Sequence, residues 1–156
     1  MSEIAVKERS VAKGLLAGLI GGLVATAAKT LAERFYPPRI AGESEPPELM
    51  AEKIAGHSLS PGAKTAAAET IHWGFGAGVG AAYGALAEYF PQVTDKDGAS
   101  FGLTLATLTH NSALPAMGLS APPEEQTGRE QTSEMATHVV FGVVTEMVRK
   151  FVRRLL

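Results

Sequence analysis

Hydrophobic and polar residues segregate along this chain into long apolar stretches separated by polar linkers. The first stretch, residues 11–35, has no charged residue between Lys13 and Lys29. Three further stretches, at about residues 61–90, 99–119 and 128–155, combine apolar residues with many small ones. A helix of about 20 residues crosses the roughly 30 Å hydrocarbon layer of a bilayer. The pattern therefore predicts an all-α fold, a single domain over residues 1–156 built as a bundle of four transmembrane helices.

Turn and capping residues mark where these helices begin and end. Pro37-Pro38 ends the first helix, because proline lacks an amide donor and clashes with the preceding turn. Residues 36–60 form a polar linker, in which Pro46-Pro47 opens either a short helix on the membrane surface or a loop with one helical turn. Thr127 and Glu130 have the spacing of a capping box at the start of the last helix.

Two other interpretations of the apolar stretches stay open. A water-soluble four-helix bundle would need a polar face, and residues 14–28 have none. The first stretch could also be a secretory signal, since Ala25, Ala27 and Ala28 offer small residues for cleavage. We favour a retained helix, because the later stretches repeat its composition.

Small residues recur along two of the predicted helices with a period of four. Such stripes let helices approach closely within a lipid bilayer, although apolar glycine-rich helices also produce them by chance. The stripes, which we expect to be helix-packing faces, are Gly14, Gly18 and Gly22 in the first helix and Gly76, Gly80 and Gly84 in the second.

Composition and charge narrow the class of protein. The 156 residues include no cysteine, which excludes disulfides and zinc sites built on cysteine. The net charge of −2 excludes a strongly basic nucleic-acid surface. Basic residues concentrate near both termini, which predicts that both termini are cytoplasmic and that the linker of residues 36–60 is external. They are Lys7, Arg9, Lys13, Arg149, Lys150, Arg153 and Arg154.

Polar side chains inside the predicted spans form the candidate site. Ionisable groups in a membrane are costly and mark function by default. At 1.5 Å per residue, His110 and His138 both lie about 16 Å from the cytoplasmic edge, with the other groups further outward. We expect these two rings to face each other and Glu134 to pair with Lys29. The whole predicted column is Lys29, Glu33, Glu69, His72, His110, Asn111, Glu134 and His138.

Three interpretations of this column remain. It is a hydrogen-bonded seam between helices, an outward-facing path for protons or small ions, or a metal or haem site at His110 and His138 helped by Glu134. We expect no cofactor. The chain also has no P-loop, no G-x-S-x-G, no H-E-x-x-H and no Rossmann fingerprint, so we expect no enzymatic activity.

Several short motifs, in order, resemble the YagU family of bacterial inner-membrane proteins, a domain family of unknown function. The resemblance implies several spanning helices in the bacterial inner membrane and supplies no reaction. The matching residues are Lys29, Glu33, Pro37-Pro38-Arg39, His72-Trp73, Tyr83-Gly84, Ala87-Glu88, Phe90-Pro91, His110, Pro115, Met117-Gly118-Leu119, Pro122-Pro123, Ser133-Glu134, His138, Glu146 and Arg149.

Two functions from different classes follow as hypotheses. The first is a small membrane protein that moves or senses protons or small ions through an outward-facing vestibule lined by His, Glu and Lys. The second is a non-catalytic structural or accessory subunit that binds a larger membrane complex through its glycine faces. Either protein has the lipid bilayer as its surroundings and a second copy or another membrane protein as its partner.

Overall fold

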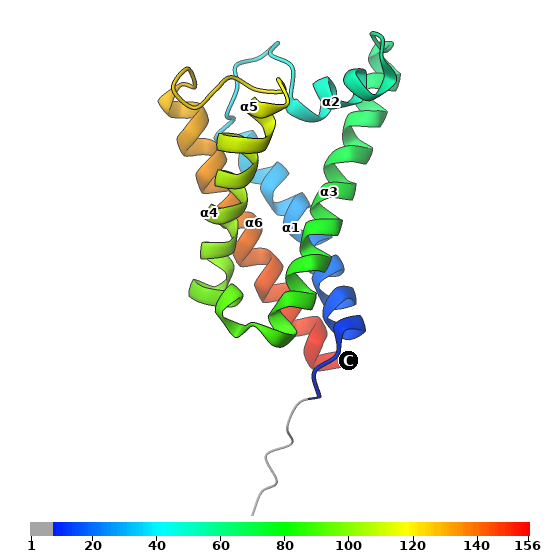
Figure 1. Cartoon of the computed structure of the whole chain (residues 1–156), viewed down its shortest axis with the longest axis vertical. Helices are drawn as coiled ribbons and strands as arrows, with labels where there is room; N and C mark the ends of the chain where they lie inside the picture. Colours follow the sequence, from blue (N-terminus) through cyan, green and yellow to red (C-terminus); the bar gives the residue numbers. More distant parts are fainter. Residues whose placement is uncertain (1–7) are drawn as a thin grey trace, which may run out of the picture.

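The computed structural model describes residues 8–156, and in that range the chain is helical with no strand (Figure 1). Lys7, one of the basic residues counted above, lies outside the described residues. The helices are α1 (Val11–Phe35), α2 (Pro46–Ala55), α3 (Pro61–Tyr89), the 3₁₀ segment η1 (Pro91–Gly98), α4 (Ala99–Leu108), the π-helical segment η2 (Thr109–Ala113), α5 (Leu114–Ala116) and α6 (Gly128–Leu155).

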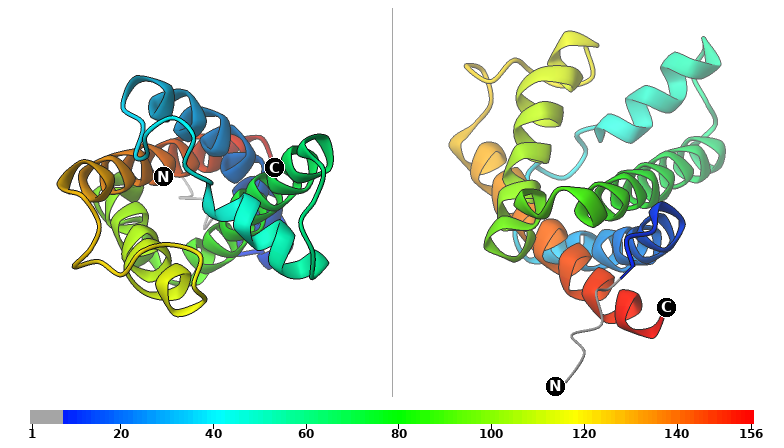
Figure 2. Two further views of the ribbon diagram at one scale, coloured as in Figure 1. Left: turned by 90° about the horizontal axis from the view of Figure 1, so that it is seen from above. Right: turned by 60° about the horizontal axis from the view of Figure 1, so that its bottom comes forward.

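The long helices are arranged around α1 and α6. Helix α1 packs mainly on α3 and α6, α4 packs on α6, and η1 joins the lower ends of α3 and α4 (Figures 1 and 2). The start of α1 and the end of α6 meet, because Lys13 Nζ donates to the carbonyl of Leu156 at 2.7 Å. The opposite end of the bundle carries α2 and the loops on either side of it (Figure 1).

The linker contains the short helix α2, one of the two forms that the sequence allowed. Glu45 and Glu48 form a capping box at its start. Gly56 ends it in the left-handed region, at φ 73°, where glycine has no side chain to clash. The helix lies across the upper end of the bundle, above the space between the long helices (Figures 1 and 2).

The two glycine stripes face each other between α1 and α3. A methyl group at Gly18 would overlap the carbonyl oxygen of Gly80, and one at Gly84 would overlap that of Gly14. The backbones therefore touch without intervening side chains. This corrects the accessory-subunit hypothesis in one respect: these glycine faces are occupied within the chain and are not available to a partner.

A second close contact, between α4 and α6, was not predicted. Methyl groups at Gly98, Gly102 and Gly142 would meet backbone atoms of the facing segment. Gly98 and Gly102 are also four residues apart, so the spacing that revealed the first two stripes was present here too. The contact brings Gly102 against the carbonyl of His138.

For the third segment, residues 99–119, the sequence predicts an interruption at Pro115, and the structure has an irregular helix there. Helix α4 ends at Leu108, and the wider π turn η2 follows before the short α5. Pro115 explains the break, because its ring has no N–H and clashes with the carbonyl four residues earlier in a regular helix. Turns of the π type inside helices are frequent at functional sites.

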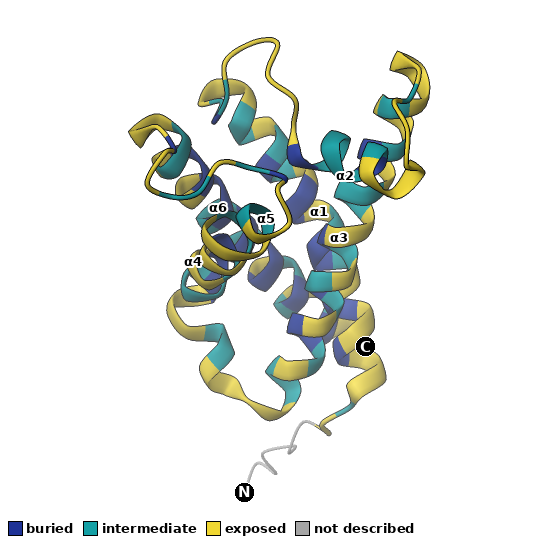
Figure 3. Cartoon of the chain, turned by 45° about the horizontal axis from the view of Figure 1, so that its top comes forward, coloured by how far each residue is buried: buried dark blue, intermediate teal, exposed yellow. Residues whose placement is uncertain are grey.

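Burial in this bundle is inverted relative to a water-soluble protein. The buried residues include Lys29, Glu134, His138, Glu146 and Arg149, whereas the buried hydrophobic residues are mostly alanines. Many large apolar side chains are exposed instead, and Figure 3 shows that exposed positions run along the long helices. Those exposed on α1 alone are Val11, Leu15, Leu16, Leu19, Val24, Leu31 and Phe35.

One helix of the described residues, α1, is long and apolar enough to cross a membrane. The sequence analysis expected four such helices. Helix α6 is long as well, but it carries charged and histidine residues that face the interior of the bundle. Length and composition alone therefore single out one candidate span.

Candidate functional site

A cavity of about 510 Å³ opens at the end of the bundle away from the two termini. Its walls come from α1, α3, α6 and the α4–α5 region, and the first turn of α2 lines it as well. Seven of the eight residues of the predicted column line it: Lys29, Glu33, Glu69, His72, His110, Glu134 and His138.

Asn111 does not belong to this cavity, which corrects the eighth member of the predicted column. It lies in η2, exposed, next to His110. Neighbouring residues of a helix point about 100° apart. With His110 turned toward α6, Asn111 is left on the outer surface.

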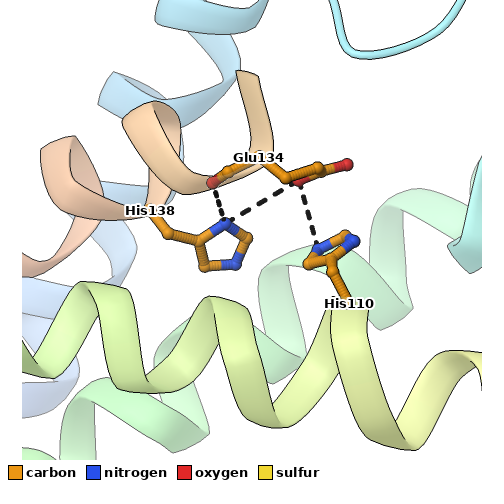
Figure 4. A group of neighbouring side chains, drawn as sticks. All are labelled: His110, Glu134 and His138. Carbon is orange, nitrogen blue, oxygen red and sulfur yellow. Dashed lines mark hydrogen bonds and ion pairs between the residues drawn. The ribbon is translucent and has the colours of Figure 1, made fainter. Parts of the chain in front are cut away.

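Glu134, on α6, is the centre of the polar cluster (Figure 4). It is 3% exposed. Its Oε1 accepts a hydrogen bond from Arg39 Nη1 at 3.2 Å. Its Oε2 lies 3.2 Å from His110 Nε2, 3.6 Å from Lys29 Nζ and 3.7 Å from His138 Nδ1. None of the described residues donates a hydrogen bond to Oε2, although the atom is buried.

The rings of His110 and His138 face each other, as the depth argument predicted, with centroids 5.0 Å apart. His138 Nδ1 donates to the backbone carbonyl of Glu134 at 2.8 Å, which places its proton on Nδ1 and leaves Nε2 as an acceptor. The backbone of His110 is also held, because Gln126 Nε2 donates a hydrogen bond to its main-chain carbonyl at 3.1 Å. The ring of His138 and the backbone of His110 are therefore each held by a hydrogen bond.

The outer residues of the column, Lys29, His72 and Glu69, form ion pairs and hydrogen bonds with neighbours on α1 and α3 as well. Lys29 forms an ion pair with Glu33 as well as the predicted one with Glu134. His72 Nε2 lies 3.2 Å from Thr30 Oγ1. Glu69 is exposed at the rim and accepts a hydrogen bond from Trp73 Nε1 at 2.9 Å.

Arg39 is the member of the site that the sequence analysis missed. It stands in the linker, and the sequence analysis named it only within the Pro37-Pro38-Arg39 motif of the family resemblance. Its side chain is 9% exposed, and it contacts Glu45 at 2.9 Å, Glu130 at 3.1 Å and Glu134 at 3.2 Å. The one sequence signal was its place directly after Pro37-Pro38, a rigid pair that directs the chain back over the bundle.

The charges of the cavity wall do not balance. Five glutamates line it against three basic side chains, which leaves an excess of two negative charges. The glutamates are Glu33, Glu45, Glu48, Glu69 and Glu134, and the basic residues are Lys29, Arg34 and Arg39. A concave surface with this excess attracts cations.

Comparison with known proteins identifies the family but no activity. Residues 23–147 match a family described as "Protein of unknown function (DUF1440)". No curated protein and no solved structure matches the chain. The match covers most of the sequence, including every residue of the cavity's polar cluster, and it is compatible with the resemblance noted from the sequence. The chain belongs to the DUF1440 family of proteins of unknown function.

Proposed function

We propose that this protein is a multi-pass protein of the bacterial inner membrane whose outward-facing cavity binds a small cation at Glu134. In this proposal α1, α3, the α4–α5 region and α6 cross the bilayer, both termini are cytoplasmic, and α2 lies on the external surface. We also propose that the chain is a member of the YagU family, which its sequence motifs resemble.

The inverted burial supports the membrane location. In water, large apolar side chains on every long helix would be an unusual surface, since wide exposed apolar areas of soluble proteins mark interfaces. In lipid the same side chains are solvated, and polar groups turn inward because each costs several kcal/mol against hydrocarbon. Helix α3 buries three of its glycines in this way, Gly76, Gly80 and Gly84. Helix α6 buries Glu134, His138, Gly142 and Glu146.

The distribution of basic residues supports the orientation. Arg149, Lys150, Arg153 and Arg154 lie in the last two turns of α6, at the end of the bundle where α1 begins. An excess of Lys and Arg marks the cytoplasmic side of a membrane protein. The cavity opens at the other end and therefore faces outward.

A buried carboxylate oxygen that accepts no hydrogen bond supports cation binding over a purely structural seam. In a seam each buried polar atom is expected to have a partner, because an unpartnered one costs about 1–3 kcal/mol. Glu134 Oε2 has no hydrogen-bond donor and is surrounded by nitrogen atoms at 3.2–3.7 Å. The cavity lining also ends near Gly76 and Phe141, which favours a binding site over a continuous path through the bundle.

Cation binding by the purified protein tests the proposal. We expect the full-length protein in detergent, stripped of metals, to bind at least one of Na⁺, K⁺, Mg²⁺, Mn²⁺ and Zn²⁺ in isothermal titration calorimetry. Glu134→Gln is expected to lose this binding at least tenfold. Glu69→Gln is the matched control, because Glu69 is at the rim of the same cavity and is engaged by Trp73. A wild-type protein that binds none of these cations, or equal binding by both variants, would overturn the proposal.

A further inference from the structure

Three potential metal ligands converge in the cavity. His110, Glu134 and His138 each offer one ligand atom, and these atoms lie within 4.8 Å of one another. Two of the residues are one helical turn apart on α6, and the third comes from η2 on the facing segment (Figure 4). The side chains are 13%, 4% and 6% exposed in chain order, so bulk water has little access to the ligand atoms.

We infer that this cluster binds a divalent transition-metal ion of the zinc class. This inference rests on the proposed function and names the class of cation that the cavity binds. Two imidazoles and one carboxylate form a common ligand set for zinc sites that keep an open position. Mg²⁺ and Ca²⁺ prefer oxygen ligands only. The two histidines therefore separate this inference from cation binding in general.

The geometry needs only a small contraction to hold such an ion. Ligand atoms about 2.1 Å from a tetrahedral metal ion are about 3.4 Å from each other. The contact between His110 Nε2 and Glu134 Oε2 is already 3.2 Å. No pair of candidate ligand atoms in the cluster is more than 4.8 Å apart, so the other pairs must approach by at most about 1.4 Å.

Surrounding groups hold the ligands as metal sites require. A metal-binding histidine usually donates its other ring N–H to a carbonyl or carboxylate, which fixes ring and tautomer. His138 Nδ1 makes such a bond to the carbonyl of Glu134, at 2.8 Å. Gln126 Nε2 fixes the backbone of His110 from the loop between α5 and α6. Glu134 Oε2 is free to accept a metal ion, because no donor bonds it.

The charge balance accommodates a dication despite two nearby cations. Lys29 has a second carboxylate partner in Glu33, and Arg39 has two in Glu45 and Glu130. Both basic groups can therefore stay paired when Glu134 binds a metal ion. The two positive charges of the ion match the two excess negative charges of the cavity wall.

Cobalt is a suitable probe, because its visible absorption reports both binding and ligand geometry. We expect full-length, metal-stripped protein in detergent to bind one equivalent of Co²⁺ with an absorption band of tetrahedral type, and Zn²⁺ to displace it. His110→Ala and His138→Ala should each weaken binding at least tenfold. His72→Ala is the matched control, since His72 lines the same cavity but bonds to Thr30. Size-exclusion elution shows which variants fold, and His110→Ala alters the residue of the pair that is less buried.

The outcomes separate this inference from the proposed function. If His110→Ala and His138→Ala bind Co²⁺ as the wild type does, or if Mg²⁺ displaces Zn²⁺ at equal concentration, the transition-metal inference is overturned while cation binding at Glu134 stands. If neither histidine variant folds, Cu²⁺ bound to the wild type decides instead: hyperfine splitting from two imidazole nitrogens in its electron paramagnetic resonance spectrum supports the inference, and its absence overturns it. If no cation binds the wild type, both proposals fail.

Discussion

Two buried glutamates on one helix, Glu134 and Glu146, have opposite surroundings. Twelve residues separate them, which is about 18 Å along α6. Glu146 is 0% exposed, and its oxygens accept from Tyr83 Oη at 2.8 Å and from Arg149 Nε and Nη2 at 2.6 and 2.8 Å. Glu134 is almost as buried, yet its Oε2 has no donor.

Burial alone therefore does not distinguish a structural carboxylate from a candidate site. What distinguishes them is whether the buried atoms are satisfied. Glu146 belongs to the closed half of the bundle, where the glycine stripes bring α1 against α3. Past Thr26 and Gly76 the cavity begins, and Glu134 lies in this open half.

The largest expected effect comes from deleting each carboxylate in turn. Glu146→Ala leaves the buried guanidinium of Arg149 without its main partner, which costs about 3–5 kcal/mol of the free energy of unfolding. Glu134→Ala should cost about 1 kcal/mol or less, because Lys29 and Arg39 keep other carboxylate partners. Unfolding of both variants in mild detergent, followed by circular dichroism, measures the difference.

Equal losses of unfolding free energy in Glu134→Ala and Glu146→Ala would contradict the distinction between the two glutamates. They would mean that Glu134 is as structural as Glu146, and the cavity would then be a seam between helices. Tyr83→Phe provides a control within the closed half, since it removes only one of the hydrogen bonds to Glu146. Its cost should lie between those of the two glutamate variants, at about 1.5–3 kcal/mol for a hydrogen bond to a charged group.

A smaller loss of stability is expected from adding a methyl group at the contact between α1 and α3. In Gly18→Ala the new methyl group would overlap the carbonyl of Gly80, so the two backbones must separate at a cost of about 1–3 kcal/mol. Gly78→Ala is the matched control, because nothing lies within 4 Å of the added carbon, and alanine favours the helix by about 1 kcal/mol. A shift of thermal midpoint with the same sign in both variants would contradict close packing as the basis of the closed half.

Local signals in the sequence explain why most helices could be predicted. Prolines and capping residues fix the ends of α1, α3 and α6 through backbone geometry within a few residues, and these ends match the structure closely. Counting residues from the helix ends also placed His110 and His138 at one depth, and their rings meet in the structure. That arithmetic works because the rise per residue of a helix is constant.

Long-range contacts and irregular turns could not be predicted in the same way. Arg39 reaches Glu134 only because the linker folds back over the bundle, which no local pattern encodes. The π turn over Thr109–Ala113 was not predicted either, and within it His110 lines the cavity whereas Asn111 does not. The two glycine stripes were visible, but the sequence could not show that they pair with each other.

The smallest expected effect concerns a third carboxylate, Asp97, which is exposed in η1. It accepts a hydrogen bond from Lys150 Nζ at 2.7 Å, and Lys150 also lies 3.5 Å from Glu146. This hydrogen bond holds the pKa of Asp97 below its ordinary value of 3.8. A lowered pKa stabilises the fold above that ordinary value, and the contribution is lost as the pH falls through the lowered pKa.

Because solvent and salt screen an exposed pair, we expect Asp97→Asn to leave the thermal midpoint at pH 7 unchanged, at low and at high salt. Asparagine also tolerates the left-handed backbone at this position, where φ is 53°. The measurement is thermal unfolding of both proteins side by side. A clear drop for the variant would mean that Asp97 positions Lys150 against Glu146, and the closed half would then depend on its surface charges as well as on the buried pair.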